Sequence, residues 1–196
     1  MIYSSNDLRY YNYKLSIDGK EESHGNDYEA DYLTDLIGRK AVDFLDSYGE
    51  MEEKQSKDMD PFLMVLSTPA PHAPFTPAPQ YENAFPDKMA PRTPSFNYVD
   101  NIMEMKHWFL RTSPAPLSDE LIDKVDGVYR DRWRTLLSVD DMIDKVMSKL
   151  DALDMLDNTY VILTSDHGYH LGTFALTIDK RMPYETGKLT SRARMN

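Results

Sequence analysis

An acidic residue and a histidine follow directly after an apolar run of the sequence. Residues 160–163 read YVIL, and a short apolar run that includes β-branched residues predicts a buried strand. Asp166 and His167 come next, in the sequence TSDHG. Because ligands bind outside the carboxyl ends of strands in open parallel α/β sheets, these two side chains are placed to hold a cation or a polar substrate. An isolated Asp-His-Gly tripeptide equally suits an Asx-type turn that satisfies backbone N–H groups.

A second candidate, His72, lies in a proline-rich segment after another predicted strand, residues 62–66. Ten of the twelve prolines fall between residues 69 and 116, and so long a segment without a periodic pattern is typical of a functional loop. His72 stands between Pro71 and Pro74, whose fixed φ angles suit a side chain that must be aimed without motion. The alternative is a solvated or structural loop histidine.

Two amphipathic helices are predicted around these sites. Apolar residues recur at helical spacing from Asp31, the expected N-cap, to about Tyr48, and a charged loop follows over residues 49–60. Ser118 caps a second helical pattern, which continues to Leu153 as one long or kinked helix. The order strand, crossover helix, strand favours a parallel sheet and therefore an α/β fold.

Near the start of the chain, alternating apolar and polar residues predict a β-ribbon. Residues 11–17 follow this period of two, and Asp18 with Gly19 supplies a dipeptide typical of hairpin turns. The many tyrosines of this segment are interpreted as packing residues.

The composition restricts the classes of protein. With 196 residues, 41% of them hydrophobic, the chain is long enough for one domain with a sizeable core. A formal net charge of -11 argues against a nucleic-acid binder, and an anionic ligand would need a local cluster of cations. No apolar run is long enough to span a membrane, and the first residues lack the apolar core of a signal peptide. Cysteine is absent, which excludes disulfides and thiolate metal sites within these residues.

Three separated segments carry a family resemblance: PAPHAPF at residues 69–75, TSDHGYH at residues 164–170 and DKRMPYE at residues 179–185. Together they resemble the sulfatase family, most closely its N-acetylglucosamine-6-sulfatase branch and more distantly the extracellular heparan sulfate endosulfatases. On this resemblance, residues 1–185 would form the central part of a sulfatase catalytic domain, and residues 186–196 a divergent polar tail.

The resemblance implies a fold and a reaction. The fold would be α/β of the alkaline-phosphatase-like type, with a partial mixed or parallel sheet flanked by helices. The reaction would be hydrolysis of the 6-O-sulfate ester of glucosamine in heparan and keratan sulfate, a step of glycosaminoglycan degradation in the lysosome. The implied partner is the sulfated glycosaminoglycan substrate, with neither nucleic acid nor membrane.

By the same resemblance, five residues have expected roles. Asp166 and His167 would ligate a calcium ion, one divalent cation per site. Lys180 would contact the sulfate as a point charge suited to an oxyanion. His72 would lie against the sulfate and stabilise or protonate the leaving group, and His170 is expected to bind substrate in the same pocket.

The family nucleophile is a formylglycine made from the cysteine or serine of a Cys/Ser-x-Pro-x-Arg motif, and neither version occurs in these 196 residues. The resemblance places this motif, with two further metal-binding aspartates, before the part that this chain represents. We therefore expect a sulfatase fragment that is inactive by itself. A sheet without its neighbouring strands would expose unpaired edges and an apolar face, which predicts poor solubility.

Two other functions stay open. One is a non-catalytic fragment that binds sulfated glycan or a partner through the proline-rich loop and the cations near Lys180. The other is a metal-dependent phosphodiesterase of the same superfamily, in which Asp-His-Gly holds zinc. His167 favours this reading, because a hard cation such as calcium prefers oxygen to an imidazole nitrogen. His72 with its prolines, and the Lys-x-x-x-Tyr-Glu pattern that starts at Lys180, weigh against it.

Overall fold

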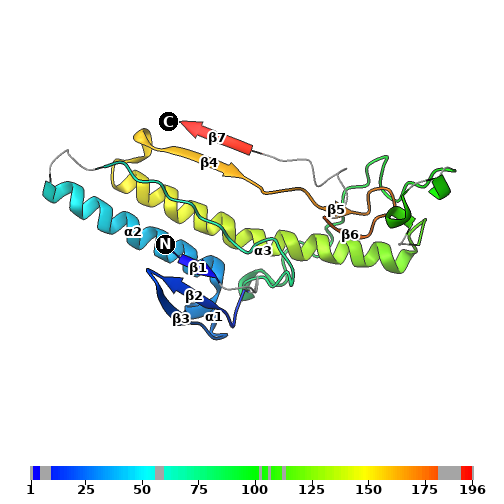
Figure 1. Ribbon diagram of the computed structural model, residues 1–196, viewed down its shortest axis with the longest axis horizontal. Helices are drawn as coiled ribbons and strands as arrows, with labels where there is room; N and C mark the ends of the chain where they lie inside the picture. Colours follow the sequence, from blue (N-terminus) through cyan, green and yellow to red (C-terminus); the bar gives the residue numbers. More distant parts are fainter. Residues whose placement is uncertain are drawn as a thin grey trace. The chain divides into compact units, whose positions relative to one another are not determined.

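The computed structural model describes residues 2–4, 10–55, 60–101, 103–105, 107–111, 114–180 and 191–195 (Figure 1). They belong to two compact units, Met1–Ala84 with Arg132–Thr159 and Phe85–Asp131 with Tyr160–Met195. The elements in chain order are β1 (Ile2–Ser4), β2 (Lys14–Ile17), β3 (Lys20–Ser23), α1 (Tyr28–Asp31), α2 (Leu33–Gln55), η1 (Pro79–Tyr81), η2 (Met103–Met105), η3 (Trp108–Arg111), α3 (Asp119–Ala152), η4 (Leu156–Asn158), β4 (Tyr160–Thr164), β5 (His170–Leu171), β6 (Ile178–Asp179) and β7 (Ser191–Met195). None of the described helices has both the length and the apolar character needed to cross a membrane.

The predicted β-ribbon is confirmed in the first unit. β2 and β3 are antiparallel, with Ile17 opposite Lys20, and β1 pairs with the other side of β2. Asp18 and Gly19 form the turn with φ of 50° and 81°, both in the left-handed region that two-residue hairpins favour. Residues 11–13 precede β2, so the strand is shorter than the pattern predicts.

The first predicted helix is confirmed as α2, but its expected N-cap, Asp31, is the last residue of α1, and α2 continues beyond Tyr48. Asp27, not Asp31, is an N-cap: its side chain accepts a hydrogen bond at 2.9 Å from the backbone N–H three residues later and starts α1. α2 continues to Gln55, through half of the predicted charged loop. Its last turns are rich in Met, Glu, Lys and Gln, which have high helix propensity. At Gly49 a Cβ would lie only 3.0 Å from the side chain of Leu153, the residue after α3, so packing there also holds this part of the helix.

α2 and the second part of α3 run side by side and in the same direction within the first unit (Figure 1). A Cβ built on Gly38 would lie 3.1 Å from Met142, and the close approach of Gly49 to Leu153 lies further along α2, just after the end of α3. The absence of a side chain at both glycines therefore allows the close approach. The predicted second helix is confirmed as the single helix α3, and Ser118 Oγ accepts a hydrogen bond from the N–H of Leu121 at 3.4 Å.

The strand predicted at residues 62–66 is not formed. Residues 61–67 belong to no strand, although their exposure alternates residue by residue as it does in one. Phe62 packs against two rings of α2, at centroid distances of 5.8 Å to Phe44 and 5.1 Å to Tyr48. The sequence pattern is that of a strand, but a strand needs a hydrogen-bonding neighbour, and the described part of the chain supplies none here.

The strand predicted at residues 160–163 is confirmed as β4, but the prediction that it is buried is wrong. Tyr160, Ile162 and Leu163 are 72%, 68% and 55% exposed. β4 pairs with β7 in antiparallel register, with Tyr160 opposite Met195. All strand pairs among the described residues are antiparallel, so the expected parallel pairing is not found there.

Candidate functional site

The loop that carries His72 is held through its backbone by side chains from three other segments of the first unit. Tyr10 Oη donates to the His72 carbonyl at 2.9 Å, and Tyr32 Oη donates to the Thr76 carbonyl at 3.0 Å. Arg132 Nη1 on α3 donates to the carbonyl before His72 at 2.7 Å. Tyr10 and Tyr32 are 1% and 0% exposed. Because buried donors have few other hydrogen-bond acceptors within reach, they hold the loop backbone in one position.

The two tyrosines remain protonated donors at neutral pH. Burial raises the pKa of Tyr10 to about 12, with opposing effects from the Thr135 hydroxyl and the Arg132 charge. Burial likewise raises the pKa of Tyr32. Their rings stack with centroids 5.8 Å apart. We call Tyr10, Tyr32 and Arg132 the loop clamp.

The His72 ring is oriented by its own loop. Its Nδ1 lies 2.8 Å from the Ala73 carbonyl oxygen, and because a carbonyl only accepts, Nδ1 must carry the proton. Nε2 of the neutral imidazole is then an acceptor that can take a proton or a hydrogen bond. The His72 N–H also donates to the Pro69 carbonyl at 2.8 Å, which closes a tight turn around the residue. The half-buried ring therefore has one fixed tautomer and one nitrogen left for chemistry.

Asp166 and His167 contact each other in a turn after β4, in the second unit. Asp166 Oδ1 accepts from the N–H of His167 at 2.9 Å, one residue on, whereas an Asx turn joins the carboxylate to the N–H two residues on. Asp166 Oδ2 lies 3.1 Å from His167 Nε2, and His167 Nδ1 lies 2.8 Å from the Gly168 carbonyl. The Asp166 side chain is 83% exposed.

This pair has the donor set for two ligands of a divalent metal ion. The Nδ1–H of a neutral His167 ring donates to the Gly168 carbonyl, which is the kind of outer hydrogen bond that metal-bound histidines commonly make. Nε2 then has a lone pair 3.1 Å from Asp166 Oδ2, so both atoms are available to one metal ion. Two ligand atoms that lie about 3 Å apart can both bind one metal ion at roughly 2 Å from each. Within the described ranges, no three His, Asp or Glu side chains group together to hold a metal. Two ligands are fewer than such an ion takes, and a metal site at this pair stays a prediction.

His170 and Lys180 belong to one small hairpin of the second unit. His170 in β5 lies opposite Asp179 in β6, and Lys180 is the next residue. The His170 side chain is 2% exposed, whereas Lys180 is exposed. Asp179 Oδ1 accepts from the N–H of Lys180 at 2.8 Å. The pairing thus brings a buried imidazole and an ammonium-bearing residue to one hairpin.

A packed cluster holds this hairpin. Phe96 forms a β-bridge with Thr173, and a Cβ on Gly172 would lie 2.3 Å from the Phe96 ring, at a φ of 88°. The Arg92 guanidinium lies over the Phe96 ring, 4.0 Å from its centroid. Arg92 is itself fixed by Asp126 at 2.6 Å. Glycine is required at residue 172 both by its φ and by this close approach.

The five predicted site residues fall into two groups. Asp166 and His167 touch, His170 and Lys180 share a hairpin, and all four lie in the second unit, whereas His72 lies in the first. Convergence of His72 with the other four stays a prediction. Residues 181–185 of the DKRMPYE segment lie outside the described residues.

Sequence reasoning missed the loop clamp, because its tyrosines were interpreted only as packing. One signal was available. Proline has no N–H, so a proline-rich loop presents more carbonyls than backbone donors, and side-chain donors must make up the difference. Buried tyrosines outside the loop are natural donors of this kind.

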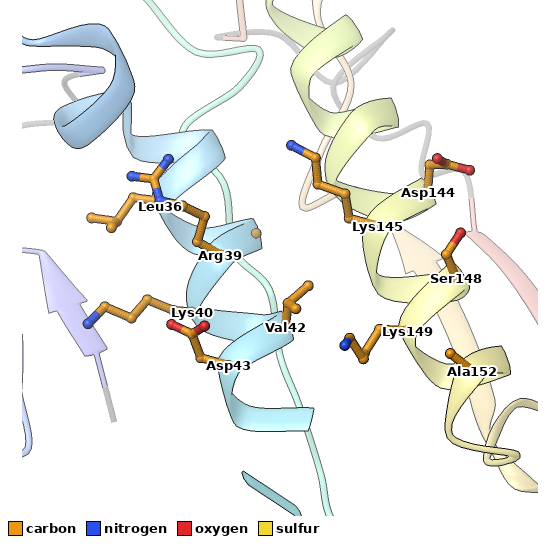
Figure 2. A pocket seen from close by; sticks show the side chains of 11 residues that line it. Leu36, Arg39, Lys40, Val42, Asp43, Asp144, Lys145, Ser148, Lys149 and Ala152 are labelled. Carbon is orange, nitrogen blue, oxygen red and sulfur yellow. The ribbon is translucent and has the colours of Figure 1, made fainter. Parts of the chain in front are cut away.

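An open groove of about 800 Å³ lies elsewhere in the first unit, between α2 and α3. Figure 2 shows Val42 of α2 and Lys149 of α3 facing the gap between the two helices. Lys149 Nζ lies 2.8 Å from Asp46 Oδ1, which ties the helices together across one end. None of the five predicted site residues lines this groove.

Comparison with known proteins gives a consistent family match. The family model described as Sulfatase matches residues 3–190. The N-acetylglucosamine-6-sulfatases of Capra hircus and Homo sapiens are 46% and 45% identical over 177 residues, which are 90% of this chain and 30% of each relative. The extracellular sulfatase SULF-1 homolog of Drosophila melanogaster is 39% identical over 90% of this chain and 15% of its own length. The chain thus spans about a third or less of these relatives.

Solved structures give the same fold. A protein solved in complex with its substrate D-glucosamine-2-N,6-O-disulfate is similar with a TM-score of 0.70 and 21% identity, over 99% of this chain and 49% of that protein. A Bacteroides fragilis protein described as a sulfatase has a TM-score of 0.64 and 18% identity, over 96% of this chain and 36% of its own. These likenesses confirm the predicted fold class, an α/β domain of the alkaline-phosphatase-like type.

Proposed function

Because this chain belongs to the sulfatase family, we propose that the complete domain it is part of hydrolyses 6-O-sulfate esters of N-acetylglucosamine units. The single observation that carries the proposal is the 45–46% identity to three N-acetylglucosamine-6-sulfatases over 90% of the chain. Heparan and keratan sulfate are the proposed glycans, and the lysosome is the proposed location, as the sequence resemblance implies.

The reaction sets three demands. A sulfate ester is a charged and poor electrophile, so its oxygens must be neutralised, a nucleophile must reach the sulfur, and the sugar oxygen must gain a proton as the S–O bond breaks. Sulfatases generally meet these demands with a formylglycine nucleophile and a divalent metal. This chain has no cysteine from which a formylglycine could be made.

We propose that His72 serves the leaving group. Its Nδ1 proton is committed to the Ala73 carbonyl, so Nε2 is the atom that would carry a proton to the departing sugar oxygen or hydrogen-bond to the sulfate. The loop clamp supports this role, because a proton donor is effective only within hydrogen-bond reach of its target. The clamp holds the loop at the His72 carbonyl and at the carbonyl before it.

Lys180 is proposed to neutralise a sulfate oxygen, and His170 to bind the substrate. Lys180 is exposed at the end of a hairpin that Phe96 and Gly172 hold, and an ammonium suits a tetrahedral oxyanion as a point charge. A divalent metal held by Asp166 and His167 would supply further positive charge to the sulfate oxygens. Calcium is the proposed ion.

A second candidate, a non-catalytic fragment that binds sulfated glycan, is favoured by one observation. No residue of the 196 can supply the family nucleophile, so the chain alone would retain only contacts to the anion. The two candidates differ in a measurable way, because binding without turnover is expected of the fragment and turnover only of the complete domain.

The test compares the chain with a chimera. The purified chain should not hydrolyse a fluorogenic N-acetylglucosamine 6-sulfate with calcium present, and turnover by it would disprove the nucleophile argument. In the chimera, residues 3–190 replace the matched part of the Bos taurus relative. The chimera should hydrolyse the 6-sulfate ester but not a phosphodiester, and the reverse preference would refute the sulfatase proposal.

Site variants of the chimera test the residue roles. His72→Ala and Lys180→Ala should each lower kcat roughly 100-fold or more, the usual size of a lost proton donor or charge contact. Lys20→Ala is the matched control, because Lys20 is an exposed lysine in the β2–β3 hairpin. Equal effects of Lys20→Ala and Lys180→Ala would remove Lys180 from the site.

A further inference from the structure

Residues 92–97 connect the hairpin of β5 and β6 to the first part of α3, and all three belong to the second unit. Asp126 of α3, which is 5% exposed, accepts hydrogen bonds from Arg92 at 3.0 Å and 2.6 Å, and from the N–H of Ala90 at 2.8 Å. A two-point contact between a guanidinium and a carboxylate fixes the orientation of both groups. We call residues 92–97 the brace.

Asn97 is the second point at which the brace is anchored, next to the start of α3. Its Oδ1 accepts from the N–H of Leu117 at 2.6 Å, and its Nδ2 donates to the Leu117 carbonyl at 3.3 Å. Leu117 is 4% exposed and lies two residues before the helix. The φ of Asn97 is 50°, in the left-handed region where asparagine is enriched. The backbone and the side chain of Asn97 therefore both favour one conformation.

The brace holds the hairpin through backbone and ring contacts. The N–H of Asn97 donates to the Gly172 carbonyl, and the N–H of Phe174 donates to the Ser95 carbonyl, both at 2.8 Å. Between these two bonds, the ring of Phe96 lies against Gly172. Three neighbouring contacts thus fix the turn of the hairpin from outside.

The other end of the hairpin has a backbone conformation that needs such support. Asp179 lies opposite His170 and directly before Lys180, and its φ is 135°. Residues other than glycine rarely adopt this φ, and it persists only where the surrounding structure holds it. Strained residues of this kind cluster at binding and catalytic sites.

We propose that Arg92 and Asn97 are positioning residues for the sulfate contact, and that they act through the hairpin on Lys180 and His170. Both positioning side chains are already committed: a carboxylate neutralises the Arg92 charge, and the Asn97 amide is bound next to the start of α3. The inference rests on the proposed function, because it requires that Lys180 neutralises a sulfate oxygen. The attraction of a point charge falls with distance, so a displacement of about 1 Å is enough to weaken it.

The first test measures the hairpin in the full chain. Asn97→Gly tolerates the left-handed φ but removes both side-chain bonds, whereas Asn97→Asp keeps an oxygen that accepts from Leu117. Asn97→Gly should speed hydrogen exchange of the Gly172 amide at least about tenfold, and Asn97→Asp should have a smaller effect. The Gly172 amide reports on the hairpin because it donates to the carbonyls of residues 176 and 177, at 2.9 Å and 3.2 Å.

Thr93→Ala is the matched control within the brace. Among the described residues, the hydroxyl of Thr93 contacts that of Ser95, at 3.0 Å, and makes no hydrogen bond to the hairpin. The exchange rate of the Gly172 amide should therefore stay within about twofold of that in the unmodified chain.

The second test is a double-mutant cycle on turnover, in the chimera that contains residues 3–190. Asn97→Gly and Arg92→Ala should each lower kcat/KM for the N-acetylglucosamine 6-sulfate at least about tenfold. In a chimera that already carries Lys180→Ala, the further loss should be less than about threefold, because the charge that the brace positions is gone. A residue with a merely structural role would lower kcat/KM by the same factor in both backgrounds.

Two results would overturn the inference. One is an unchanged exchange rate of the Gly172 amide in Asn97→Gly and Arg92→Ala, and the other is an equal loss of kcat/KM with and without Lys180→Ala. If Arg92→Ala does not fold, the two Asn97 variants give the same comparison. Unchanged turnover in Lys180→Ala alone would instead disprove the role of Lys180 in the proposed function, and the positioning role with it. The exchange measurement needs no catalysis, so the two failures are distinguished.

Discussion

The His72 loop and the Asp166 turn are built in opposite ways. Three side chains from distant segments hold the carbonyls of the His72 loop, and two of them are fully buried tyrosines. The Asp166 turn makes its hydrogen bonds with itself, from residue 164 to residue 168, and the Asp166 side chain is 83% exposed.

This difference indicates which of the proposed site residues the chain holds in place by itself and which it does not. A side chain held by buried donors keeps its geometry in the absence of a ligand. A carboxylate at a solvent-exposed turn has its geometry fixed only when an ion and further ligands join it. We infer that this chain preorganises the proposed proton donor, and that it presents the proposed metal ligands for completion by other residues.

The largest difference between the two regions is expected when one side chain of each is truncated to alanine and the free energies of unfolding are compared. Tyr32→Ala removes a ring that is 0% exposed and a donor to the loop, and should lower the free energy of unfolding by about 3–5 kcal/mol. Asp166→Ala should change it by less than about 0.5 kcal/mol, because the side chain is exposed. Chemical denaturation of the two variants measures both values. Similar losses in the two variants would contradict the comparison.

A smaller effect is expected when only the clamp hydroxyl is removed. Tyr10→Phe keeps the packed ring but loses the bond to the His72 carbonyl, and should cost about 1 kcal/mol and speed amide exchange at His72. The pKa of Tyr10 is raised to about 12, from an unfolded value of 10.0. The contribution of this hydroxyl is therefore fully present below pH 10 and is lost as the pH rises through about 12.

The pH dependence of stability provides a control for the Tyr10→Phe prediction. The stability difference between the chain and Tyr10→Phe should be constant from pH 7 to pH 9 and should shrink between pH 10 and pH 12. Tyr98→Phe is the matched variant, since Tyr98 lies in the second unit and is 50% exposed. A Tyr10→Phe difference that stays constant to pH 12, or an equal effect of Tyr98→Phe, would remove Tyr10 from the loop clamp.

The sequence predicted elements whose signals are local. Helical spacing and the Ser118 cap identified α3, and Asp18 with Gly19 identified the hairpin of β2 and β3. Where the prediction failed, a distant partner decided the outcome. Residues 62–66 have a strand pattern without a neighbour to pair with, and α2 extends through Gly49 because Leu153 packs there. Burial of β4 was predicted from its apolar run, but burial depends on what covers the strand.

For the candidate site, the sequence predicted only which residue types follow a predicted strand or lie among prolines. Those patterns, with the family resemblance, selected His72, Asp166 and Lys180. They did not reveal that Tyr10 and Arg132 hold the loop, because a hydrogen bond to a carbonyl about 60 residues away leaves no periodic trace in the sequence. The tautomer of His72 likewise follows from a contact distance to the next residue, which the residue types alone do not give.

The smallest expected effect is that of metal ions on the chain alone. If the Asp166 turn provides just two ligands, calcium should bind weakly, since this ion takes six to eight oxygens. At 1 mM calcium the free energy of unfolding should then rise by no more than about 0.4 kcal/mol, the gain for a ligand present at its own Kd. Calorimetric titration and NMR of the His167 ring measure binding, with Asp166→Asn as the test variant and Asp154→Asn as the control at another exposed aspartate. Micromolar calcium binding that Asp166→Asn abolishes and Asp154→Asn does not would show a complete metal site within this chain, and the contrast between the two regions would fail.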